Sequence, residues 1–463
     1  MGFKKQTLAL AAAAALTAAT AVPALALENE FHGMFRLKGV VNNFNATPVI
    51  NSPEGVPYGF YKPDNLDKKV PTATYIEQRA RIMYIAKAND DLKLVTHFEI
   101  DSRWGDASYT NARNKGGAIG ADTVNIETKS VYLDFNCPLT GSNVKVGMQP
   151  YYDAFKGVLF DADMAGLLVS RSFGKLDAAA GFFRFDDKGT IPGKKTRDMV
   201  AATAKYAVTK DIKVGGAYYF IDDDRSETDT FVRDYIIQQQ GDTNTVHNIG
   251  VNAEANLGLV TIDGFFLYQF GSLRAPVSRH VSAFAGNVGA RGKIGPGTAR
   301  TEFLYVSGDK GGSSTTNAFQ SVQDEHGFYN GNMQLLFRDA YAMTIDNAIV
   351  YTSNNKDQGV IAGFIGYDLP ITSKLSTSVN AGFAAVAKDN GNKPVNPVTG
   401  QANKSSYLGT EVNASVDYKL FDNMTASVRG AYVILGDYYN GVAAGAEDPR
   451  DPYMGSLILN YAF

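Results

Sequence analysis

Apolar and polar residues alternate along most of this 463-residue chain, in segments of roughly ten residues. In segment 30–44, one alternate set of positions is apolar or glycine, and the other set contains Arg36 and Lys38. The same alternation recurs in 74–88, in 92–103 and in later segments up to the carboxyl terminus. Because successive side chains of a strand point to opposite faces, the pattern predicts β-strands with one apolar and one polar face.

The connectors between these segments are alternately short and long. Short turns such as Asn-Asp-Asp at 89–91 alternate with long polar stretches. This alternation is typical of a transmembrane antiparallel β-barrel with short periplasmic turns and long extracellular loops. We expect about 18 strands if 308–357 is one long loop. An extra hairpin in that region would give about 20, and the loss of two weakly patterned segments elsewhere would give about 16. The long connectors are 44–73, 104–123, 222–244, 308–357, 389–405 and 438–452.

The polar face of the first three segments is strongly charged. In a membrane every backbone polar group needs a partner, so a sheet without helices must close on itself. A barrel of this size is too wide for side chains to fill, and a water-filled interior is expected. Charged side chains on the inner face then meet water or one another. The predicted pore-lining residues of these segments are Arg36, Lys38, Glu77, Arg79, Arg81, Lys93, Glu99, Asp101 and Arg103.

The amino-terminal segment 1–26 has the pattern of a secretory signal peptide. Lys4 and Lys5 precede an alanine-rich apolar run, which ends in the small-residue cleavage pattern Ala-Leu-Ala. The alternative, an anchoring helix, is disfavoured because no basic stop-transfer group follows. We therefore expect a mature chain of 27–463 that forms one barrel domain, without a transmembrane helix.

Charge and cysteine content exclude several functional classes. The chain has 44 basic and 47 acidic residues, and the two lysines of the predicted signal peptide reduce the basic count to 42, for a mature net charge of −5. Nucleic acid is therefore not an expected partner. The single Cys137 and five scattered histidines make no disulfide, metal or haem framework, and no catalytic motif is present. We expect no cofactor and no enzymatic activity.

The last segment, GSLILNYAF, keeps its alternation up to the final residue. Leu457, Leu459, Tyr461 and Phe463 are expected to face lipid, with the two aromatic rings at the membrane interface. Ile458 fits poorly on the opposite, luminal face. We expect this strand to pair with the first strand and so to close the barrel.

The chain resembles the Gram-negative outer-membrane porins. The signal peptide carries the resemblance together with LKLVTHFEIDSR, KSVYLDF…NVKVGMQPYYD and the ending YKLFDNMTASVRGAYVILGDYY…LNYAF, although VGMQ lacks the arginine often found there. The resemblance implies a passive diffusion channel for small hydrophilic solutes and ions, surrounded by outer-membrane lipid and lipopolysaccharide. It also implies that the barrel-assembly machinery recognises Tyr461 and Phe463 as an insertion signal. A homotrimer is a further expectation from the resemblance.

In such porins the loop after the fifth strand folds inward. By resemblance, this constriction loop is PYYDAFKGVLFDADMAG at 150–166, next to Gln149. Asp153, Asp161 and Asp163 would then face a basic row across the pore and create a transverse field. This basic row consists of Arg36, Lys38, Arg79, Arg81, Lys93 and Arg103. The alternative is an ordinary external loop whose charges are solvated.

Two other functions stay open. One is a substrate-specific channel, for example for anions or carboxylates, which the basic row favours. The other is a sheath or scaffold barrel that houses a periplasmic partner such as an electron carrier, or an adhesive surface protein.

Overall fold

The computed structural model describes most of the chain after the predicted signal peptide. The signal peptide and parts of several long connectors lie outside the described residues. Within the described residues, no helix is long and apolar enough to cross a membrane. The described ranges are 27–44, 72–106, 116–120, 125–188, 192–193, 195–224, 243–274, 278–322, 329–346, 348–391, 393–442 and 446–463.

The described strands form a single sheet of 19 members, all paired antiparallel except β14, a two-residue piece inside a connector that pairs parallel with β12. The remaining 18 build the wall, as predicted. They are β1 (Glu28–Asn42), β2 (Ala73–Asn89), β3 (Leu92–Arg103), β4 (Glu127–Asn136), β5 (Asn143–Tyr152), β6 (Asp161–Phe173), β7 (Leu176–Asp187), β8 (Thr196–Ala207), β9 (Ile212–Asp223), β10 (Asn244–Asn256), β11 (Val260–Leu273), β12 (Arg279–Ile294), β13 (Gly297–Val306), β15 (Val360–Pro370), β16 (Leu375–Ala385), β17 (Tyr407–Phe421), β18 (Met424–Leu435) and β19 (Tyr453–Ala462), with β14 (Thr315–Thr316) and a short 3-10 helix, η1 (Asp437–Tyr439), in connectors.

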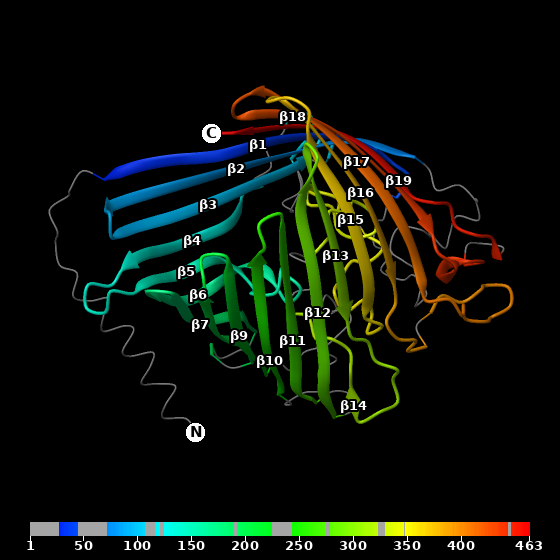
Figure 1. Cartoon of the computed structure of the whole chain (residues 1–463), viewed down its shortest axis with the longest axis horizontal. Coiled ribbons are helices and arrows are strands. Elements are labelled where there is room, and N and C mark those ends of the chain that lie inside the picture. The colour runs from blue at the N-terminus through cyan, green and yellow to red at the C-terminus, as the bar shows by residue number, and fades with distance from the viewer. Residues whose placement is uncertain are drawn as a thin grey trace.

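The barrel closes between its first and last strands. Strand β19 pairs antiparallel with β1, from Met34 opposite Ala462 to Asn42 opposite Met454. In Figure 1 the blue β1 and the red β19 lie side by side, although they come from opposite ends of the chain. Every other long strand pairs with its sequence neighbours, and β13 pairs with β15. The pairing of β1 with β19 joins the two edges of the wall, and the predicted pairing of the last strand with the first is confirmed.

The two faces of the wall differ as the alternation predicts. Leu457 is 61% exposed on the outer face, and Phe266 is 50% exposed. Inward positions on the same sheet, such as Asn248, Gln269 and Ser456, are buried. A sheet with a continuous exposed apolar outside and a polar inside suits a hydrocarbon surrounding. Ile458, the predicted misfit on the inner face, is 1% exposed, so the apolar side chain is shielded from water.

Short and long connectors lie at opposite ends of the barrel. The turns at one end contain two to six residues, and those at the other end contain five to 53 residues. Both described termini lie at the short-turn end, because the wall has an even number of strands. Region 307–359 is a single connector between β13 and β15, as interpreted from the sequence. Its described part adds only β14 to the sheet and has one isolated bridge of its own, between Phe337 and Val350.

Two connectors fold into the barrel and meet there. In loop 153–160, the Phe155 ring packs against the rings of Tyr219 and Phe265 on the inner wall, with centroids 6.1 and 5.6 Å apart. A side chain at Gly250 would come within 2.5 Å of the Phe155 ring, so this position has to be glycine for the loop to approach. The backbone N–H of Val322, in the long connector, donates to the Leu159 carbonyl at 3.4 Å. The two connectors and the wall share one buried apolar cluster.

Candidate functional site: the interior of the barrel

The predicted charged residues of β2 and β3 form ion pairs on the inner wall. Arg79 makes a bidentate contact with Asp101 at 2.8 and 2.6 Å, and Arg81 binds Glu99 at 2.5 Å. The strand register causes this, because Arg79 lies opposite Asp101 and Arg81 opposite Glu99. Arg79 also lies 3.4 Å from Glu99, so acids and bases alternate in one ladder. Mutual pairing offsets the cost of removing these ions from water.

The other basic residues predicted to line the pore lie at different heights. Lys93, near the short-turn end of β3, is 3.4 Å from Asp134, and Arg103, at the other end, is 2.6 Å from Asp106. The predicted row therefore spans the height of the barrel instead of one constriction level. Its role as a pore lining stays a prediction.

The loop after the fifth strand is shorter than predicted. Strand β5 continues to Tyr152 and β6 begins at Asp161, so the connector is 153–160 instead of 150–166. Asp153 is turned into this loop and is 2% exposed, so it does not face the basic row. Burial raises the pKa of Asp153 to about 6, although four hydrogen bonds act in the opposite direction. The carboxylate accepts them from the backbone N–H groups of Phe155, Gly157, Leu159 and Phe160.

The remaining residues predicted for this loop belong to the wall. Asp161 and Asp163 lie on β6, and Asp163 pairs with Lys129 of β4 at 2.8 Å. Gln149, on β5, is buried and donates to the carbonyl oxygen of Gly166 at 3.1 Å. The resemblance to porins placed Asp161 and Asp163 in the loop, whereas β5 and β6 stay paired up to Tyr152 opposite Asp161.

The long connector supplies inner contacts that the sequence reasoning missed. Asp339 accepts hydrogen bonds from Lys38 at 3.0 Å and from Arg429 at 2.7 Å. Burial opposes ionisation of Asp339, but the charges of Lys38 and Arg429 outweigh it and lower the pKa to about 2. The apolar stretch around 333–337, inside an otherwise polar connector, was the available signal that this segment is buried.

A buried carboxylate on β17 holds the same connector in place. Glu411 is 0% exposed and accepts backbone N–H groups of Gln334, Leu335 and Leu336 at 2.8, 2.9 and 2.6 Å. Asn413, two residues along the same inward face, donates to Glu411 at 2.7 Å. The strand thus presents a fixed acceptor to three consecutive donors of a segment without regular structure.

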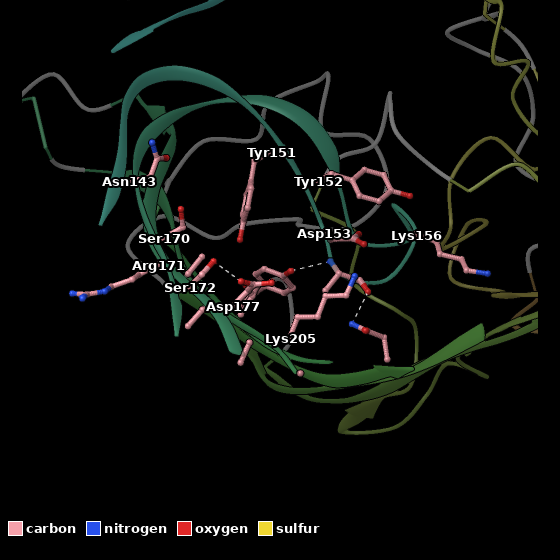
Figure 2. Close-up of a pocket in the computed structure, with 18 of the residues that line it drawn as sticks. Asn143, Tyr151, Tyr152, Asp153, Lys156, Ser170, Arg171, Ser172, Asp177 and Lys205 are labelled. Atoms are coloured by element: carbon pink, nitrogen blue, oxygen red, sulfur yellow. Dashed lines mark hydrogen bonds between the residues drawn. The ribbon is translucent and has the colours of Figure 1, made fainter. Parts of the chain in front are cut away.

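Beside loop 153–160 lies a chamber of about 780 Å³, lined by wall residues of β4 to β10, by the turn between β4 and β5 and by the loop itself (Figure 2). Small inward side chains such as Ala179 and Thr203 leave this space open. Ser172 and Asp177 are joined by a hydrogen bond of 2.5 Å at its wall, whereas Arg171 points away from it. Hydroxyl, amide, carboxylate and ammonium groups therefore share one solvent-accessible chamber.

A closed 18-strand barrel with an apolar outside, a charged inner wall and inward-folded connectors has the fold of the bacterial outer-membrane porins. Three Pseudomonas aeruginosa crystal structures are similar, each at 12% identity over 94% of this chain: OpdL (99% of that chain, TM-score 0.54), the outer membrane protein OpdK (98%, 0.50) and OccK2, also called OpdF (98%, 0.50). No protein-family model and no curated protein matches the sequence. At 12% sequence identity, the similarity to these structures shows the fold alone.

Proposed function

We propose that this protein is a passive, water-filled channel of the bacterial outer membrane, through which small hydrophilic solutes and ions diffuse. The charged inner wall of β1 to β3 carries the proposal, because charged side chains on the inner face of a barrel with an apolar exterior are typical of a water-filled channel. Signal peptide 1–26 would direct export.

A second candidate is a channel selective for anions. It is favoured by the convergence of Arg36, Lys38 and Arg429 on one level of the interior, where Asp339 is bound by two of them. The sheath function is less well supported, since the two inward connectors fill space that a protein partner inside the barrel would need.

The apolar outer surface of the barrel indicates which membrane components contact it. We propose that outer-membrane lipid and lipopolysaccharide surround the apolar band, and that the barrel-assembly machinery reads the ending. The backbone of Phe463 exchanges two hydrogen bonds with Gly33, at 2.8 and 3.0 Å, and its ring stacks on Tyr461 at 5.6 Å. Homotrimeric assembly stays a prediction.

The test is the conductance of the purified protein in a planar bilayer, with the reversal potential measured across a KCl gradient. Arg81→Glu should move the reversal potential toward cation preference, because Arg81 is a partly exposed charge of the ladder. Lys374→Glu, the same charge change in the exposed turn after β15, is the control. A folded wild-type protein without conductance would overturn the proposal.

A further inference from the structure

Three basic residues of the inner wall surround one segment of the long connector. Lys38 on β1 lies 3.0 Å from one carboxylate oxygen of Asp339, and Arg429 on β18 lies 2.7 Å from the other. Lys38 also donates to the Tyr341 carbonyl at 3.1 Å. Both oxygens of a single carboxylate are therefore held by cations from two strands, in a site where Lys38 is only 3% exposed.

The aromatic ring of Tyr341 completes the contact. The guanidinium carbon of Arg36 lies 4.6 Å from the ring centroid, and that of Arg429 lies 4.4 Å from it. Cations within about 6 Å of a ring centroid are attracted to its electron-rich face. The connector thus contacts all three cations with one carboxylate and one ring, and Arg36 also donates to the Asn460 side-chain oxygen on β19 at 3.1 Å.

The wall alone does not balance these cations. Glu77 is the nearest wall carboxylate, 3.8 Å from Lys38, and it also accepts the backbone N–H and the hydroxyl of Thr344 at 2.9 and 2.7 Å. Arg79, on the next strand, is occupied by Asp101. Without Asp339, Arg429 would lose its carboxylate partner and Lys38 would keep only Glu77 at 3.8 Å, and a buried uncompensated charge is costly. The site therefore requires an anion from the connector or from solution.

The connector is anchored in two chemically different ways. Around 335–337 it is held by apolar burial, with Leu336 and Phe337 both 0% exposed. Around 339–344 it is held by ion pairs and hydrogen bonds through Asp339, Tyr341 and Thr344. A dissolved anion cannot replace buried apolar contacts, but it can make the same charge-assisted bonds as Asp339.

We propose that Arg36, Lys38 and Arg429 form an anion-binding site of the lumen, which the connector fills with Asp339 and Tyr341 as an internal ligand. Withdrawal of this segment opens the site to small anions, such as halides and carboxylates. The inference rests on the proposed channel function, and it specifies which contact limits anion passage.

The test compares reversal potentials of wild-type protein and Asp339→Asn in a KCl gradient. Removing the internal anion should raise the chloride-to-potassium permeability ratio roughly three- to tenfold, the change expected from the loss of one charge-assisted contact. Asp309→Asn is the matched control: it removes the same charge from the same connector, where Asp309 pairs with Arg279 at 3.2 Å away from the site. The control should leave the ratio unchanged.

Two further measurements separate the outcomes. Adding Arg429→Gln to Asp339→Asn should cancel the gain in chloride permeability, because the site loses one of its cations. Tyr341→Leu, which keeps the Asp339 charge, should give a smaller gain in the same direction and provides a second variant if Asp339→Asn does not fold.

Equal ratios for Asp339→Asn and Asp309→Asn in conducting channels would overturn the internal-ligand proposal alone. Absence of conductance in the wild-type protein would overturn the channel function, and this proposal with it.

Discussion

Replacement of Glu411 by glutamine is expected to loosen the long connector without unfolding the barrel. The carboxylate accepts three backbone N–H groups and the Asn413 amide. Glutamine has one acceptor oxygen and turns an NH₂ group toward the other donors, so at least one buried backbone N–H group loses its partner. That loss costs about 1–3 kcal/mol, and losing the charge on the remaining bonds adds about 1 kcal/mol. We expect a total of about 2–4 kcal/mol, which favours opening of the connector by roughly thirty- to several-hundredfold.

Hydrogen exchange measured by mass spectrometry tests this expectation. Peptides covering 334–336 should exchange faster in Glu411→Gln by that factor, whereas peptides from the wall strands should not change. Asp417→Asn is the control, because it removes the same charge from the same strand, where Asp417 accepts the Ser427 hydroxyl at 2.5 Å. Unchanged protection at 334–336 in Glu411→Gln would refute the assignment of Glu411 as the anchor.

Two other predictions concern pH and assembly. The pKa of Asp339 is lowered from 3.8 to about 2 in the folded protein, so its contribution is complete above about pH 4 and is lost as the pH falls toward 2. Protection at 339–341, taken relative to the intrinsic exchange rate at each pH, should therefore fall between about pH 4 and 2, and Asp339→Asn should remove this loss of protection. At Gly33 an added side chain would come within 2.5 Å of the Phe463 ring, whereas at Gly39, on the same face of β1, nothing lies within 4 Å. Gly33→Val should reduce the heat-modifiable, folded fraction in outer-membrane preparations, as should deletion of Phe463, while Gly39→Val should assemble normally; equal assembly of the two valine variants would contradict this account.

The wall of the barrel could be predicted almost entirely from the sequence. Alternation with period two is a local property, and it identifies strands whose outward residues, such as Leu457 and Phe266, meet an apolar surrounding. Backbone pairing in hydrocarbon then requires closure, so β19 has to meet β1. The ladder of Arg79 and Asp101 follows from the same pattern, because cross-strand neighbours on one face are forced together.

The contents of the barrel were decided by the tertiary structure. The connectors carry no periodic pattern, and apart from the apolar stretch at 333–337 no local rule tells whether 307–359 lies outside or folds inward. Lys38 and Asp339 are separated by 301 residues, and only the closed barrel brings them to 3.0 Å. Asp153 was placed in the correct connector, but its orientation depends on the loop's own backbone N–H groups. The sequence by itself determined a charged, closed wall, because period and register are local. The tertiary structure alone decided which charges the loops neutralise, because those contacts join distant parts of the chain.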